Sequence, residues 1–90
     1  MNIVYIADVK SDNSEKKECM RKYYPNPDGV YPKVGERVFD WVMGDDGEDT
    51  VEIVKTAYCF ERQEYMVWLG EVKGNLDFLR HNHWETVKVY

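Results

Sequence analysis

The sequence predicts a small β-rich α+β domain: a twisted antiparallel sheet of about five strands with one or two short helices. Three observations support this fold class. Segments of alternating or β-branched apolar residues recur along the chain and are separated by short polar links. Ninety residues make one domain, spanning 1–90. Three tryptophans, seven tyrosines and three phenylalanines can fill the thin core of so short a chain.

The first two elements differ in character. Residues 1–9, "MNIVYIADV", are short and β-branched, which predicts a strand covered on both faces. Residues 11–24, "SDNSEKKECMRKYY", begin with N-cap residues and continue with good helix formers. We expect a short helix here, and a mobile charged loop is the alternative. Its apolar stripe would consist of Cys19, Met20, Tyr23 and Tyr24.

The middle of the chain alternates in the manner of strands. The segments "VFDWVM", "TVEIVKTAYCF" and "YMVWLGEV" are joined by the polar links "GDDGED" and "ERQE". Short links favour an antiparallel meander. In the second segment we expect Val51, Ile53 and Ala57 to share one face. Apolar neighbours place Phe39 and Trp68 in the core.

The chain closes with a short helical segment and a strand. Leu76, Phe78 and Leu79 in "GNLDFLRHNHW" predict one or two helical turns, and "TVKVY" predicts a strand over residues 86–90. One arrangement of these elements pairs the first and last strands beside the meander.

The start of the meander carries a recognisable pattern. Pro32, Gly35, Glu36 and Val38 follow Pro-x-x-Gly-[Asp/Glu]-x-Val, and this run resembles the opening of small SH3-like barrels. Physically, the proline stiffens the backbone before the strand, and the glycine permits a φ that turns the chain into the sheet. The resemblance covers about half the chain and implies that the sheet closes as an SH3-like barrel. It implies a fold, not an activity.

Charge and targeting features argue against a nucleic-acid-binding, membrane or secreted protein. The net charge is −5, and residues 36–52 hold seven acids against the single base Arg37, a local charge of −6. Direct nucleic-acid binding is disfavoured because it depends on basic residues that neutralise phosphates. We expect no membrane span and no signal peptide. Two cysteines, Cys19 and Cys59, form no CxxC pair, which is typical of reduced thiols in a cytoplasmic protein.

The acidic segment "GDDGED" has three interpretations. Glycine and aspartate are turn formers, so a solvated hairpin tip is the simplest. A partner-binding acidic tip is the second, because such charge can steer a basic partner. A metal site is the third, but the spacing does not match a calcium loop, which needs a glutamate where Thr56 stands, twelfth from Asp45. The four acids concerned are Asp45, Asp46, Glu48 and Asp49.

Catalytic patterns are weak. His81 and His83 could lie on one face of an extended segment and hold a metal, which leaves a metal-dependent hydrolase as one alternative. A polar turn anchored by Trp84 is the simpler interpretation. Basic neighbours of Cys19 would lower the pKa of its thiol, whereas burial would oppose this. The chain has no phosphate-binding loop. We therefore expect no enzyme, no cofactor and no metal.

Aromatic residues give the strongest functional hypothesis. A small core cannot enclose every ring, and rings left exposed are common recognition sites. We expect a small cytoplasmic binding protein, of the size common in bacteria and phages, that presents aromatics beside an acidic loop to a protein partner. The contact residues would be Tyr31, Trp41 and Tyr58, with Asp45, Asp46, Glu48 and Asp49 steering association. An acidic nucleic-acid mimic, such as a phage inhibitor of a host enzyme, is a further alternative.

Overall fold

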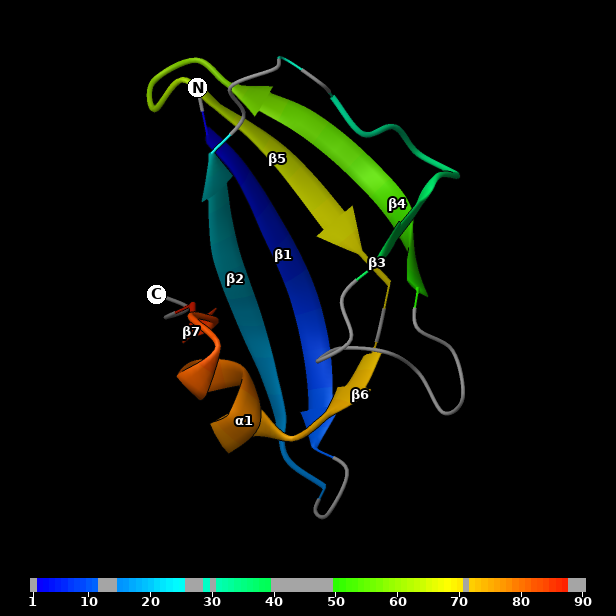
Figure 1. Cartoon of the computed structure of the whole chain (residues 1–90), viewed down its shortest axis with the longest axis vertical. Helices are drawn as coiled ribbons and strands as arrows, with labels where there is room; N and C mark the ends of the chain where they lie inside the picture. Colours follow the sequence, from blue (N-terminus) through cyan, green and yellow to red (C-terminus); the bar gives the residue numbers. More distant parts are fainter. Residues whose placement is uncertain are drawn as a thin grey trace.

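A computed structural model describes residues 2–11, 15–25, 29, 31–39, 50–70 and 72–87, with residues 39 and 50 described for the backbone alone. These residues form a β-rich domain with one short helix, as the sequence predicts (Figure 1). None of the helical residues described forms a segment long and apolar enough to cross a membrane. The elements are β1 (Asn2–Ser11), β2 (Lys17–Pro25), β3 (Arg37–Phe39), β4 (Thr50–Cys59), β5 (Glu64–Leu69), β6 (Val72–Gly74), α1 (Leu76–His81) and β7 (Glu85–Thr86).

The strands form one curled sheet in the order β3-β4-β5-β1-β2-β7, and β6 continues the ladder along β1 (Figure 1). The meander β3-β4-β5 is antiparallel, as predicted. The prediction of a wholly antiparallel sheet is wrong, because β1 runs parallel to both β5 and β6. The β1–β2 hairpin docks through β1, whose residues are apolar on both faces, so β1 becomes a central strand. The first strand therefore pairs with β5 and β2, while β7 pairs with β2.

Over residues 17–24 the expected helix is wrong, and so is the alternative of a mobile loop, while residues 12–14 lie outside the described residues. Most of this segment forms β2, which pairs with β1 from Lys17 to Pro25. Its side chains alternate: Met20 is fully buried in the core, while Cys19 on the opposite face is half-buried. Long-range pairing with an apolar strand outweighs the helix preference of a few exposed charged residues, which amounts to tenths of a kcal/mol each.

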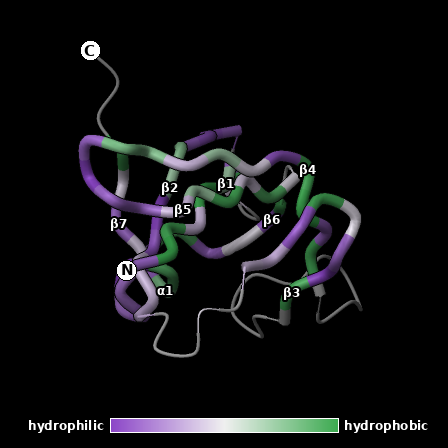
Figure 2. The backbone as a smooth tube through the Cα atoms, turned by 90° about the horizontal axis from the view of Figure 1, so that it is seen from above, coloured by the Kyte–Doolittle hydropathy of each residue, from purple (hydrophilic) through white to green (hydrophobic). Residues whose placement is uncertain are grey.

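The core lies on one face of the sheet, which we call the core face. α1 and β3 both lie on this side, as seen from above in Figure 2. The opposite face, which we call the outer face, has no covering layer among the described residues. The buried core residues are Ile3, Ala7, Val9, Met20, Val51, Ile53, Val67, Leu69, Val72, Leu76, Leu79 and Trp84.

A bulge in β4 changes which side chains point inward. Ile53 pairs with Leu69, but the next pair is Lys55 with Trp68, so one residue is inserted. Ala57 is exposed for this reason, although its spacing from Val51 predicts burial. Trp68 lies on the outer face because Val67 and Leu69, its neighbours in β5, take the core face. It is half-buried, with the Lys55 ammonium 4.6 Å from its ring centroid. The prediction that Trp68 is a core residue is wrong.

A tight turn precedes β3 and matches the predicted role of its glycine. Gly35 has φ of 92°, and the Glu36 amide donates to the Lys33 carbonyl at 3.0 Å. The Glu36 carboxylate in turn accepts from the Lys33 amide at 2.8 Å. The Gly35 amide and the Glu36 carbonyl then bond with Ile53, which fastens the turn to β4. The glycine is required because only it adopts this φ without strain.

Replacing Gly35 with alanine is expected to lower the free energy of unfolding by about 1–3 kcal/mol. An added Cβ would meet no atom within 4 Å, so the cost comes from the backbone conformation alone. Urea denaturation followed by circular dichroism measures it. Val34→Ala is the control, since Val34 is 59% exposed, and an equal loss in both variants would contradict the explanation.

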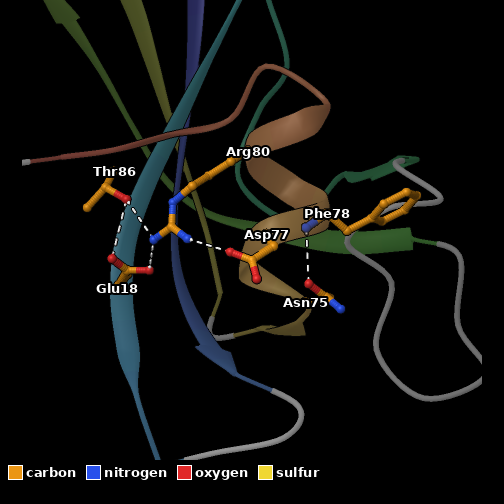
Figure 3. A network of polar contacts seen from close by, with 6 residues as sticks. All are labelled: Glu18, Asn75, Asp77, Phe78, Arg80 and Thr86. Atoms are coloured by element: carbon orange, nitrogen blue, oxygen red, sulfur yellow. Dashed lines mark hydrogen bonds and ion pairs between the residues drawn. The ribbon is translucent and has the colours of Figure 1, made fainter.

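A polar network fastens α1 to the sheet (Figure 3). The Asn75 side chain caps the helix by accepting from the Phe78 amide at 3.0 Å. The Arg80 guanidinium bonds to Glu18 of β2 and to Asp77 at 3.2 Å. Thr86 of β7 donates to Glu18 at 3.4 Å, so three elements meet at one carboxylate. The network therefore holds the helix over the core face, at the end of the sheet away from the start of β1 (Figure 1).

Candidate aromatic binding site

A row of side chains crosses four strands near the start of β1. Ile3 pairs with Tyr24 of β2 on one side and with Tyr65 of β5 on the other, and Tyr65 pairs with Tyr58 of β4. Directly paired residues point to the same face of a sheet. Ile3 is a core residue, so the three tyrosines project from the core face. This end of the sheet lies away from α1 (Figure 1).

Two further aromatic rings pack against this row. The Tyr31 ring lies edge-on to Tyr65, with 5.1 Å between ring centroids. Phe60, in the turn after β4, lies edge-on to Tyr58 at 4.9 Å. We call the set Tyr31, Tyr58, Phe60 and Tyr65 the aromatic end. Edge-to-face pairs of this kind each contribute about 0.5–1.5 kcal/mol beyond the area they bury.

Exposure differs sharply within the aromatic end. Phe60 is 85% exposed, Tyr31 41% and Tyr58 38%. Tyr65 is half-buried, and its hydroxyl donates to the Pro32 carbonyl at 2.8 Å. The hydrogen bond fixes the central ring, which in turn supports Tyr31. The aromatic end thus offers exposed rings held against a fixed one.

The row is joined to the core by a second aromatic group. The Tyr5 ring lies edge-on to Tyr24 at 5.3 Å. Burial, and then the nearby Tyr24 hydroxyl, raise the pKa of Tyr5 above its ordinary value. The Lys22 ammonium lies 4.9 Å from the Tyr24 ring centroid and 6.0 Å from that of Trp84. A lysine on the core face is tolerated here because aromatic faces attract the cation.

The outer face carries different chemistry. Val4 is only 2% exposed although no described element covers this face, because it lies between its strand neighbours Tyr23 and Met66.

Arg21 on this face bonds to Glu85 at 2.7 Å, which raises the pKa of its guanidinium. Burial, and then the neighbouring Asp8, raise the pKa of the Cys19 thiol, while Arg21 opposes them. Burial therefore prevails over basic neighbours at Cys19.

Cys19 is accordingly expected to alkylate with iodoacetamide at neutral pH more slowly than the same residue in urea-unfolded protein. A raised pKa leaves less of the reactive thiolate, and partial burial limits access. Mass spectrometry of timed aliquots measures modification at this residue. Faster labelling in the folded protein would contradict the environment described. Both cysteines are free thiols in the structure.

The structure brings together two of the three predicted contact residues. Tyr31, in a loop, packs its ring edge-on against Tyr65, and Tyr58 of β4 pairs with Tyr65 across the sheet. Phe60 was missed, and the available signal was an apolar residue directly before the polar link "ERQE". The remaining predicted residues lie outside the described part of the chain: Trp41, Asp45, Asp46, Glu48 and Asp49.

The two alternative functions, a metal-dependent hydrolase and an acidic nucleic-acid mimic, would use residues outside the aromatic end. His81 ends α1 and His83 follows it with φ of 73°, and both are exposed. Within the described ranges, no three His, Cys, Asp or Glu side chains gather where they could hold a metal ion. The acids that the mimic would use are Glu52 in β4, Glu61 in the turn after β4 and Glu64, which begins β5 and pairs with Cys59. Asp40 lies outside the described residues. The acidic mimic stays a prediction, because the acidic loop that it requires lies outside the described residues.

Comparison with known proteins found no matching protein family, no similar curated protein and no similar solved structure.

Proposed function

We propose that this chain is a small non-catalytic binding protein that presents its aromatic end to a protein partner. The observation that carries the proposal is the exposed Phe60 ring, 85% accessible yet positioned by its contact with Tyr58. Full burial of a phenylalanine side chain is worth about 1.5–3 kcal/mol relative to exposure, so a partner that covers this ring gains that free energy.

The supporting rings are suited to the same role. Tyr31 and Tyr58 combine an apolar ring with a polar hydroxyl, and tyrosine is enriched where binding energy concentrates in interfaces. Tyr65 is fixed by its hydrogen bond to Pro32, so the surface is ordered before a partner arrives. Preorganisation of this kind improves affinity because fewer side chains lose freedom on binding.

Site-specific photocrosslinking tests the proposal. Benzoylphenylalanine replaces Phe60 in one variant and Phe78 in a control, because Phe78 is also exposed, at 42%, but lies on α1. We expect that illumination in the native host cell crosslinks a partner protein to position 60 and none to position 78. Equal adducts at both positions, or none at position 60, would refute the proposal.

Under this proposal, the acidic segment increases the rate at which the partner associates with the protein. Asp45 and Asp46 lie in a region of charge −6, which attracts a basic partner surface over a distance of about the Debye length. Replacing both with asparagine is expected to slow association several-fold at low salt and to flatten its salt dependence. Stopped-flow or surface-plasmon measurements with the crosslinked partner check this, and an unchanged association rate would remove the steering role.

A further inference from the structure

One long edge of the sheet has no neighbouring strand among the described residues, and it lies beside the aromatic end. β4 pairs with β5 along residues 53–59, but β3 covers its other edge only at residues 50–52. The turn at Gly35 and Glu36 then bonds with Ile53. Beyond this point no described residue makes a backbone hydrogen bond to the outer edge of residues 54–59. Among the residues that the structure describes, β4 therefore has no strand beside about 20 Å of this edge, from the rise per residue of a strand.

An open edge carries alternating N–H and C=O groups that another extended chain can pair with. We propose that the partner binds by strand addition: an extended segment of about six residues pairs with β4 along residues 54–59. This inference rests on the proposed function, because it specifies how a partner reaches the aromatic end. The other edge of the sheet is less suitable, since β7 covers part of β2 and Pro25 at its end lacks an N–H.

The side chains along this edge permit close approach. Thr56 and Ala57 are small, and the one charged residue, Lys55, directs its ammonium onto the Trp68 ring of the neighbouring strand. A lysine that protects an edge strand points into the space that a new strand would occupy. Lys55 does not, because its ammonium lies over the Trp68 ring. Tyr58 projects from the core face and contacts Phe60. Alternate side chains of an added strand would pack on that pair of rings.

The occupant that fits is a segment of a different protein, apolar at alternate positions and neutral or basic overall. A second copy of this chain could offer the same edge, but two copies would bring together net charges of −5 each, which repel. A neutral or basic segment avoids this repulsion. Backbone pairing supplies affinity, while the rings of Tyr58 and Phe60 select for the apolar side chain.

The probe for the test is a displayed library of random twelve-residue peptides, selected on the folded, full-length protein. The most enriched peptide is synthesised in three forms: unmodified, N-methylated at every even amide, and N-methylated at every odd amide. Only one set of alternate amides faces β4, so one methylated form should lose at least tenfold in affinity and the other should bind nearly as the unmodified peptide does. Hydrogen exchange of the alternate β4 amides that face outward should slow at least tenfold when the unmodified peptide is bound.

The outcomes separate the binding mode from the function. Enriched peptides that tolerate both methylation patterns, or that leave the β4 amides unprotected, overturn strand addition; so does a selection that enriches no peptide. A peptide that tolerates both methylation patterns can still lose affinity when Phe60 is replaced by alanine. In that case the aromatic end remains a binding site, and only binding by strand addition is refuted. A free protein that dimerises with β4 protected would assign the edge to a second copy and would also overturn the proposal.

Discussion

Replacing Trp84 with alanine is expected to lower the free energy of unfolding by about 3–5 kcal/mol, the largest stability effect of any substitution considered for this chain. Trp84 is 3% exposed and belongs to the core cluster beneath α1. Its amide also donates to the Leu79 carbonyl at 3.0 Å, so it connects the end of the helix to the core. Removing the ring leaves a cavity between helix and sheet that neither element can close by itself.

Trp84→Phe is the matched control, and it isolates a second effect. The indole Nε1 of Trp84 is buried and has no hydrogen-bond partner among the described atoms. An unpaired buried donor costs about 1–3 kcal/mol, so phenylalanine loses packing area but also removes this penalty. We expect Trp84→Phe to cost under about 1.5 kcal/mol. Urea denaturation of both variants measures the difference, and equal losses would contradict the described packing.

Replacing Tyr58 and Phe60 together with alanine is expected to weaken partner binding at least tenfold, which corresponds to about 1.4 kcal/mol. Neither residue belongs to the core cluster, so the fold should be retained, at a loss of about 0.5–1.5 kcal/mol from the Tyr58–Phe60 ring contact. Truncating central aromatic anchors of an interface commonly costs 2 kcal/mol or more each. Isothermal titration of the crosslinked partner gives the affinity, and urea denaturation confirms the fold. Phe78→Ala, which removes an exposed ring from α1, should bind like the parent chain.

Local patterns in the sequence predicted the elements whose structure depends on nearby residues. Alternation identified β4 and β5, and Leu76, Phe78 and Leu79 identified α1. The glycine of the start motif takes the positive φ that was expected at Gly35. The SH3-like barrel stays a prediction, because the described strands form a curled mixed sheet in which β1 runs parallel to β5.

Features that depend on distant residues could not be predicted. Residues 17–24 carry helix-forming charges, and only the apolar β1 beside them makes a strand the better solution. The direction of β1 relative to β5 leaves no mark on either segment, because both parallel and antiparallel partners show the same alternation. The bulge after Ile53 inserts one residue and reverses the faces of the rest of β4, which leaves Ala57 exposed.

The candidate site also has one feature that the sequence could predict and one that it could not. Exposed aromatics could be expected from composition alone, because thirteen rings exceed what a ninety-residue core encloses. Their grouping around Tyr65 could not, because it requires the Ile3 register in β1, the pairing of Tyr58 in β4 and the loop that brings Tyr31 across. Pro32 contributes through its carbonyl, which accepts from the Tyr65 hydroxyl and which no sequence pattern marks.

The central claim is that the aromatic end is the surface a partner covers, and amide chemical-shift mapping tests it most directly. The ¹⁵N-labelled protein is titrated with the unlabelled partner identified through position 60. We predict that the largest shift changes fall at Tyr31, Tyr58, Phe60 and Tyr65, while the amides of α1 remain unchanged. Changes concentrated on α1, or on the outer face around Lys55 and Trp68, with the aromatic end unaffected, would contradict the claim.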